Sequence, residues 1–137
     1  MKYLLDTNVL SELRKGTRCD AHVARWADAA PSDSLFVSVL VLGEIRRGVE
    51  RLRRKDPKQA KRLSAWLEQI KGAFAGRILG VDEAVAESWG SHDVPEPKPV
   101  VDGLIAATAR VHGLTLVTRN TADFRRAGVA VLNPFGG

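Results

Sequence analysis

The sequence predicts an α/β fold, in which helices cover both faces of a central, mostly parallel, twisted sheet of four to five strands. The first observation is a set of short apolar runs, bounded by turn-forming residues, which are typical of buried strands. The second is that longer segments with apolar residues at helical spacing separate these runs. Such alternation of apolar strands with helices is typical of a parallel sheet with helices on both sides.

The first half of the chain begins with the apolar run from Tyr3 to Leu5, which predicts a buried strand ending at Asp6. Asp20 and Ser38 are residue types that cap helix N termini, and each precedes a helical segment. The expected strands are 3–5 and 35–37, and the expected helices are 9–14, 21–29 and 39–53. The longest helix has an apolar stripe made of Val41, Leu42, Ile45, Val49 and Leu52.

The second half begins with Asp56 and Pro57, a helix cap followed by the residue favoured at the first helical position. Three prolines between positions 91 and 99 predict a loop. Gly113 follows a helical pattern and is typical of a helix C-terminal cap. The expected helices are 57–71, 83–89 and 100–112, with a brief helical turn around 123–124, and the expected strands are 78–81, 114–117 and 129–132.

Length and composition restrict the class of protein. The 137 residues are 45% hydrophobic and 27% charged, as in an ordinary soluble globular protein, and predict one domain covering 1–137. Cys19 is the only cysteine, which excludes an internal disulfide framework and fits a reducing cytoplasm. No apolar stretch approaches the roughly 18 residues of a membrane span, so no membrane partner is expected.

The charge of the chain favours a polyanionic partner. Its formal net charge is +5, and basic residues are concentrated in one helical region. Two interpretations of this region remain open: a solubilising helical surface, or a track that binds a phosphate backbone by releasing condensed counterions. The basic residues of the region are Arg46, Arg47, Arg51, Arg53, Arg54, Lys55, Lys58, Lys61 and Arg62.

Four acidic residues lie at places where a shared site could form. Asp6 follows the first strand, and Asp123 follows the strand at 114–117. Glu44 lies in the long helix and Asp102 in the first turn of a later one. Each acid alone has an ordinary structural explanation, as a helix cap, a solvated residue, a residue stabilised by the helix dipole or a turn residue. If the strands before Asp6 and Asp123 are neighbours, however, both acids emerge at the same edge of the sheet.

Glycines stand beside two of these acids. Gly43 and Gly48 flank Glu44, and Gly103 follows Asp102. The absence of side chains at these positions predicts space for a bound group.

Carboxylates gathered at one site repel each other, so such a cluster requires a shared proton or a bound cation. Oxygen ligands suit hard cations such as Mg²⁺ or Mn²⁺, which serve phosphate chemistry. An acidic pocket on a basic chain therefore indicates a phosphodiester substrate. The chain contains no GxxxxGK[ST] or GxGxxG motif, and its scattered histidines build no zinc site. Asn8 occupies the position at which haloacid-dehalogenase-like phosphatases carry a second aspartate, which disfavours that class.

Four segments resemble the PIN-domain ribonucleases, in particular the FitB-like branch of the VapC toxins of bacterial toxin–antitoxin pairs. They are LLDTNVLSEL, SVLVLGEIRRGVERL, VDGLIAATARVHGLTLVTRNTADF and GVAVLNPF, in the order of the family. The resemblance implies a PIN-like three-layer α/β/α fold. It also implies an endoribonuclease that uses Mg²⁺, or Mn²⁺ in its place, and cleaves RNA by in-line attack of a metal-activated water.

The resemblance also implies roles for particular residues. Asp6, Glu44 and Asp102 match the first three acidic positions of the family. Asp6 and Asp102 would bind the metal directly, and Glu44 directly or through water. The fourth position is either Asn120 or Asp123, both of which count as catalytic candidates. Thr7 and Thr118 would be polar helpers in the pocket.

Family members usually form dimers and are held inactive by a cognate antitoxin. The resemblance therefore implies a homodimer, an antitoxin partner and a higher assembly on operator DNA, in addition to the RNA substrate. The alternative is a non-catalytic nucleic-acid-binding or regulatory partner whose acidic pocket binds an antitoxin arginine. The basic region from Arg46 to Arg62 motivates this alternative.

Overall fold

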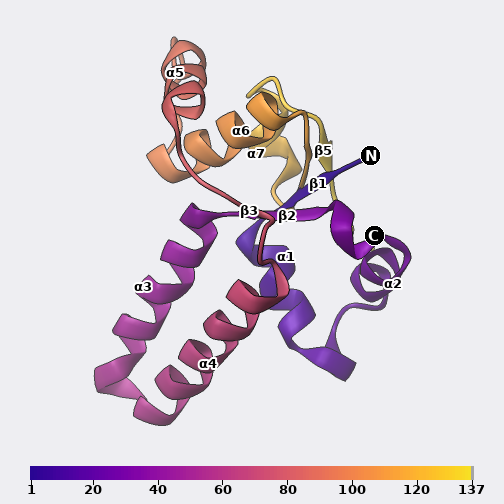
Figure 1. Ribbon diagram of the computed structural model, residues 1–137, viewed down its shortest axis with the longest axis vertical. Coiled ribbons are helices and arrows are strands. Elements are labelled where there is room, and N and C mark those ends of the chain that lie inside the picture. Colours follow the sequence, from indigo (N-terminus) through magenta and orange to yellow (C-terminus); the bar gives the residue numbers. More distant parts are fainter. Residues whose placement is uncertain (137) are drawn as a thin grey trace.

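The computed structural model describes residues 1–136 and contains one five-stranded parallel sheet with the order β3-β2-β1-β4-β5 (Figure 1). Gly137, the last residue of the expected domain, lies outside the described residues. Tyr3 of the central strand pairs with Leu35 on one side and with Thr115 on the other. The strands are β1 (Tyr3–Leu5), β2 (Leu35–Ser38), β3 (Ile78–Leu79), β4 (Thr115–Val117) and β5 (Val131–Leu132). The predicted mostly parallel α/β fold is confirmed.

The α-helices of the described chain connect these strands. They are α1 (Thr7–Arg14), α2 (Ala21–Ala29), α3 (Val39–Lys55), α4 (Pro57–Ala73), α5 (Glu83–His92), α6 (Val100–His112) and α7 (Thr121–Arg125). Two short 3₁₀ turns, η1 (Gly16–Arg18) and η2 (Ser32–Ser34), flank α2. Among the described residues, no helix is long and apolar enough to cross a membrane.

The strand order determines which face of the sheet each helix covers. The chain moves outward from β1 to β2 and β3, and then returns to β4 on the other side of β1. Because parallel crossovers are right-handed, this reversal places the later helices on the opposite face. Figure 1 shows α6 and α7 on one side of the sheet, and α1, α3 and α4 on the other. The neighbouring strands β1 and β4 therefore form a topological switch point, and in open α/β sheets ligands bind at the carboxyl ends of the strands at such a point.

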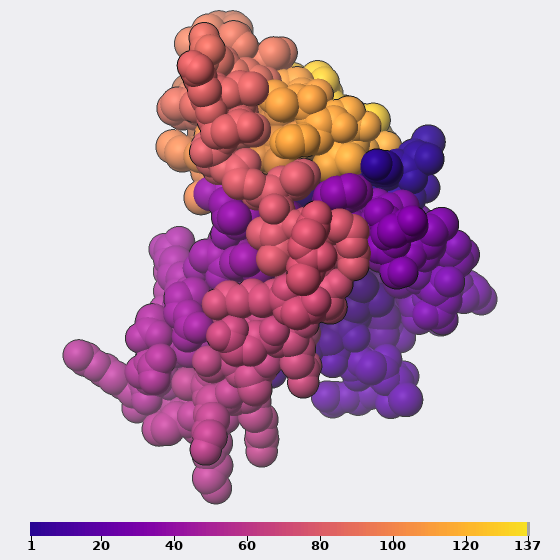
Figure 2. Space-filling view, viewed as in Figure 1, coloured from indigo at the N-terminus to yellow at the C-terminus, as the bar shows by residue number. Residues whose placement is uncertain are grey.

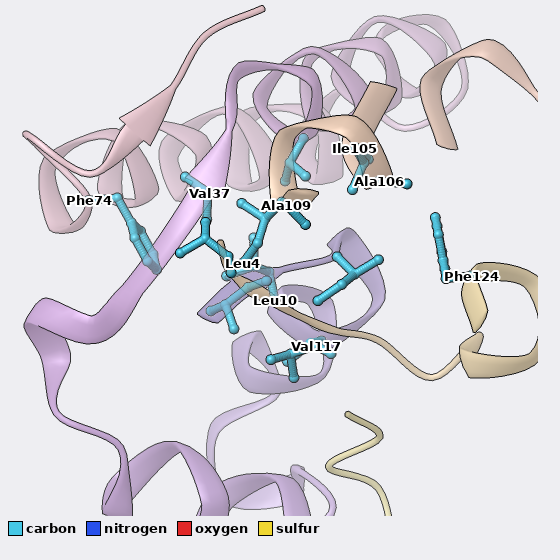
Figure 3. Packing of buried hydrophobic residues seen from close by; sticks show 14 of the residues in the cluster. Leu4, Leu10, Val37, Phe74, Ile105, Ala106, Ala109, Val117 and Phe124 are labelled. Carbon is cyan, nitrogen blue, oxygen red and sulfur yellow. The ribbon is translucent and has the colours of Figure 1, made fainter. Parts of the chain in front are cut away.

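The hydrophobic core forms on both faces of these short strands. Leu4 is fully buried and Leu5 is 1% exposed, because successive residues of the central strand point to opposite, covered faces. Leu4, Val37 of β2 and Ala109 of α6 belong to one core cluster, which Figure 3 shows. Small side chains on α6 let this helix approach the sheet closely, which is why its alanines Ala106, Ala107 and Ala109 are all buried.

Several element boundaries differ from those expected. Helix α1 begins at Thr7 instead of residue 9, because the Asp6 side chain accepts a hydrogen bond from the Thr7 backbone N–H (2.8 Å). Helix α5 continues to His92 instead of ending near residue 89, so the proline-containing loop starts at Asp93. The strands β3 and β5 are each two residues long and therefore shorter than predicted.

Two of the three glycines beside the acids serve helix packing. A Cβ atom at Gly48 would lie 3.3 Å from Leu63 of α4, and one at Gly103 would lie 2.8 Å from the ring of Trp89 on α5. The expectation of space for a bound group at Gly48 and Gly103 is therefore wrong: neighbouring side chains fill it. Only Gly43 has open space where a Cβ atom would stand.

Candidate active site at the carboxyl edge of the sheet

Asp6 lies at the switch point between β1 and β4. Its backbone N–H extends the parallel ladder by donating to the Val117 carbonyl oxygen (3.0 Å). The Asp6 residue is only 8% exposed, and its Oδ2 accepts a hydrogen bond from the fully buried Thr118 hydroxyl (2.8 Å). Because the residues after adjacent parallel strands emerge together, the first and fourth strands fix this carboxylate between them.

Asn8 completes the hydrogen bonding around Asp6. Its Nδ2 donates to the Thr118 hydroxyl oxygen (3.2 Å) and, more weakly, to Asp6 Oδ2 (3.4 Å). Its Oδ1 accepts from the Arg119 backbone N–H (3.1 Å), so the side chain joins the loops after β1 and β4. We call Asp6, Asn8 and Thr118 the carboxylate clamp. Sequence reasoning assigned no positive role to Asn8, although its position on the first turn after Asp6 is a usable signal.

Glu44 joins the site from the second turn of α3. The Thr7 hydroxyl donates to Glu44 Oε1 (2.8 Å) and links this glutamate to the residue that follows Asp6. The residue as a whole is exposed, but its carboxylate is partly shielded from water and accepts this hydrogen bond. Loss of hydration there, together with the negative charges of Asp6 and Asp102, raises the pKa of Glu44. The hydrogen bond from Thr7 partly opposes this increase.

Asp102 enters the site from the first turn of α6 and is half-buried. Burial raises its pKa, and the charges of Asp6 and Asp123 raise it further, whereas Lys98 acts in the opposite direction. Asp102 and Asp123 also line the same cavity, of about 560 Å³, with Lys98 and Arg126 on its wall. Lys98 is held there by a hydrogen bond from its Nζ to the Asp123 carbonyl oxygen (2.9 Å).

The two candidates for the fourth position lie in different surroundings. Asp123 is exposed in the first turn of α7 and lies close enough to Asp102 to raise its pKa. Asn120 is also exposed, and its backbone N–H donates to the Thr118 hydroxyl (3.0 Å). Asp123 therefore interacts with the other acids through its charge. Asn120 interacts with the carboxylate clamp through a backbone hydrogen bond.

Helices begin around this edge and offset part of the repulsion. Helices α1, α3 and α6 each place their N termini at the carboxyl side of the sheet, because each runs antiparallel to the strands. The positive end of a helix dipole favours nearby carboxylates by about 0.3–1 kcal/mol at exposed sites. The Asp6 carboxylate benefits directly, since it accepts from the first N–H of α1.

The donor set fits a hard divalent cation. Asp6, Glu44 and Asp102 present only oxygen atoms. Burial, and after it the charges of neighbouring carboxylates, raise the pKa of Glu44 and of Asp102, and a bound cation would neutralise part of that charge. Within residues 1–136, no three His, Cys, Asp or Glu side chains are already gathered as a metal-binding group. The acids therefore lie along the carboxyl edge of the sheet without closing on a single point.

Comparison with known proteins gives one family. A PIN domain is matched over residues 3–130. The chain is 40% identical to Toxin FitB of Neisseria gonorrhoeae over 138 residues, which cover 96% of this chain and 97% of the relative. It is 33% identical to VapC ribonuclease Y4jK of Sinorhizobium fredii over 141 residues, covering 96% of both proteins.

A solved structure agrees with these sequence matches. The crystal structure of FitAcB from Neisseria gonorrhoeae superposes with a TM-score of 0.84 at 39% identity, covering 96% of this chain and 97% of the other. The PIN-domain match over residues 3–130 includes every element that contributes to the site.

Proposed function

The chain belongs to the PIN-domain family, and on this premise we propose that it is the toxin of a toxin–antitoxin pair, an endoribonuclease that hydrolyses RNA phosphodiesters with Mg²⁺ or Mn²⁺. The observation that carries the proposal is the carboxylate clamp at the switch point, with Glu44 and Asp102 close enough to interact with its charge. This acidic site lies on a chain of net charge +5, which attracts a polyanion.

The residues divide the work between holding a cation and holding the acids in place. We infer that Asp6 and Asp102 bind the metal and that Glu44 binds it directly or through water. When bound, such a cation neutralises charge on the phosphoryl oxygens. Thr118 and Asn8 orient the Asp6 carboxylate, while Thr7 orients that of Glu44. We assign the fourth acidic position to Asp123, because its charge acts on Asp102.

Lys98 complements these acids. Its ammonium group lies beside Asp123 on the wall of the cavity that Asp102 also lines. A phosphate that approaches the acidic edge would meet this positive charge, which partly offsets the repulsion by the carboxylates.

Membership of the PIN-domain family also supports a proposal about the partners of the chain. We propose that residues 1–137 act as one domain, in the cytoplasm, as a homodimer held inactive by a cognate antitoxin, and that the pair assembles on operator DNA. The naming of the relative Toxin FitB supports the toxin role. A second candidate, a nucleic-acid-binding partner without catalysis, rests on the basic region from Arg46 to Arg62.

Cleavage of total RNA by the purified chain tests the proposal. We expect products with Mg²⁺ or Mn²⁺, none in EDTA, and none from Asp6→Asn or Asp102→Asn. Asp33→Asn is the matched control, because Asp33 is an exposed acid before β2 and outside the site. Equal cleavage by the wild type and both site variants would identify a contaminating nuclease and remove the proposal. RNA binding that persists in EDTA without any products would favour the non-catalytic candidate.

A further inference from the structure

Basic residues occupy two different faces of α3. Arg47, Arg51 and Lys55 follow Glu44 at intervals of three or four residues, so all lie on the face of the helix that carries Glu44. We call these three residues the basic row. Arg46 and Arg53 are seven residues apart and share another face with Glu50.

The two faces differ in how their charges are satisfied. Arg53 donates to both carboxylate oxygens of Glu50 (3.0 and 2.9 Å), and Arg46 donates to the Ser64 hydroxyl of α4 (3.5 Å). By contrast, the described residues offer the basic row no ion pair within 4.0 Å and no side-chain hydrogen bond. The three residues of the row are all exposed. Solubility alone does not explain why one face is paired and the other is left with its positive charge.

The basic row begins at the acidic site. Arg47 lies one helical turn after Glu44 on the same face of α3. Its positive charge opposes the burial and the neighbouring carboxylates that raise the pKa of Glu44. Arg51 and Lys55 then follow at intervals of one helical turn, about 5.4 Å along the axis. In Figure 1, α3 and α4 form a hairpin that extends away from the sheet, and Figure 2 shows long side chains protruding at its far end. The row therefore leads from the acidic edge out along the hairpin.

We propose that the basic row binds successive phosphates of a single RNA strand and guides that strand into the acidic site. This inference rests on the proposed ribonuclease function and adds the path by which the substrate reaches the site. Regularly spaced, unpaired cations on flexible stems match a repeating polyanion, and phosphate contacts position a strand without reading its sequence. An acidic protein segment is the competing ligand, but the start of the row beside a phosphodiester site favours RNA.

Salt-dependent binding of a labelled single-stranded oligouridine, measured in EDTA so that no cleavage occurs, tests the row. The variant is Arg51→Gln/Lys55→Gln, which leaves Arg47 beside Glu44 in place. The control is Arg46→Gln/Arg53→Gln, which removes two charges from the same helix on another face. A single strand contributes about 0.7 to the slope of log K against log salt for each phosphate contact. The row variant should therefore reduce the magnitude of the slope by about 1.4, and the control should leave it unchanged.

Cleavage of total RNA by the same proteins provides the second readout. If the row acts by binding, the variant raises KM and leaves kcat near the wild-type value. Equal slope changes in the variant and the control would overturn the proposal, because charge alone would then explain binding. An unchanged slope with weaker binding of polyglutamate would overturn it in favour of an acidic protein ligand. Since the slope is measured without catalysis, an inactive wild type would refute the ribonuclease proposal and leave the test of the row intact.

Discussion

Asp6 and Asp123 lie on the same edge of the sheet, but the fold holds them by different means. Asp6 follows the central strand, is 8% exposed, and accepts hydrogen bonds from Thr118, Asn8 and the first N–H of α1. Asp123 is exposed on a five-residue helix and interacts with Asp102 through charge. One carboxylate is therefore fixed before any ligand arrives, while the other can move toward a ligand. This difference predicts that activity is more sensitive to substitution of Asp6 than of Asp123.

The largest effect on activity is expected when Asp6 and Asp123 are each replaced with asparagine in separate variants. Asp6→Asn should reduce cleavage by more than about 100-fold, because even the loss of an outer partner of a metal ligand costs about 10–100-fold. Asp123→Asn should cost less, because the exposed side chain contributes charge at a distance. Initial rates of RNA cleavage over a range of Mg²⁺ concentrations measure both. Equal losses of cleavage rate in the two variants would contradict the prediction, because the two carboxylates would then be held equally firmly by the fold.

The next effect concerns the carboxylate clamp itself. Thr118→Val removes a buried hydroxyl that donates to Asp6 and accepts from Asn8 and the Asn120 N–H. We expect apparent metal affinity or activity to fall by about 10–100-fold, and the free energy of unfolding to fall by about 1–3 kcal/mol.

Thr115→Val is the control for that prediction. It makes the same chemical change on the same strand, at the start of β4, whereas Thr118 follows the end of that strand. Urea unfolding and metal titration of both variants measure the effects. A clamp variant that behaves like the control would show that the fold positions Asp6 without its hydroxyl partner.

The next effect concerns stability, and it differs between two glycines that stand beside the acids. Gly103→Ala places a methyl group 2.8 Å from Trp89, and overpacking of this kind costs about 1–3 kcal/mol of stability. Gly43→Ala meets open space in a helix interior and should gain about 0.5–1 kcal/mol. Chemical unfolding of the two variants measures these opposite signs. Destabilisation by both would mean that space beside Glu44 is required by the fold.

The smallest effect involves an acid outside the site. The Lys15 ammonium and the Asp20 N–H hold the pKa of Glu12 below its usual 4.5, in contrast to the raised pKa values of Glu44 and Asp102. A lowered folded-state pKa contributes stability at pH values above 4.5, and this contribution is lost as the pH falls through the folded-state value. Thermal unfolding should therefore show a steeper acid-side loss for the wild type than for Glu12→Gln. Parallel curves would contradict this.

The sequence predicted the fold well because its signals are local. Capping by Asp20 and Ser38, the proline after Asp56 and the left-handed cap at Gly113 lie where expected, since each depends on backbone groups within a few residues. Acids at strand ends and helix starts were recognisable for the same reason. The end of α5 was missed because three prolines beyond it obscured its last turn.

Features that depend on distant contacts were beyond sequence reasoning. Nothing near Gly103 indicates that Trp89 fills the space beside it, because α5 and α6 meet only in the folded chain. The bridge from Asn8 to the loop after β4 spans 111 residues and has no local signature. The choice between Asn120 and Asp123 likewise depends on how α7 faces α6, and the roles of both residues remain predictions.

The switch point also has a consequence for synthesis on the ribosome. The hydrogen bond between Asp6 and Thr118 joins residues 112 positions apart, and β4 can pair with β1 only after residues 115–117 have emerged. A nascent chain therefore carries Asp6 without its clamp until Thr118 has also emerged. Assembly of the acidic edge is thereby delayed until both strands of the switch point are outside the ribosome.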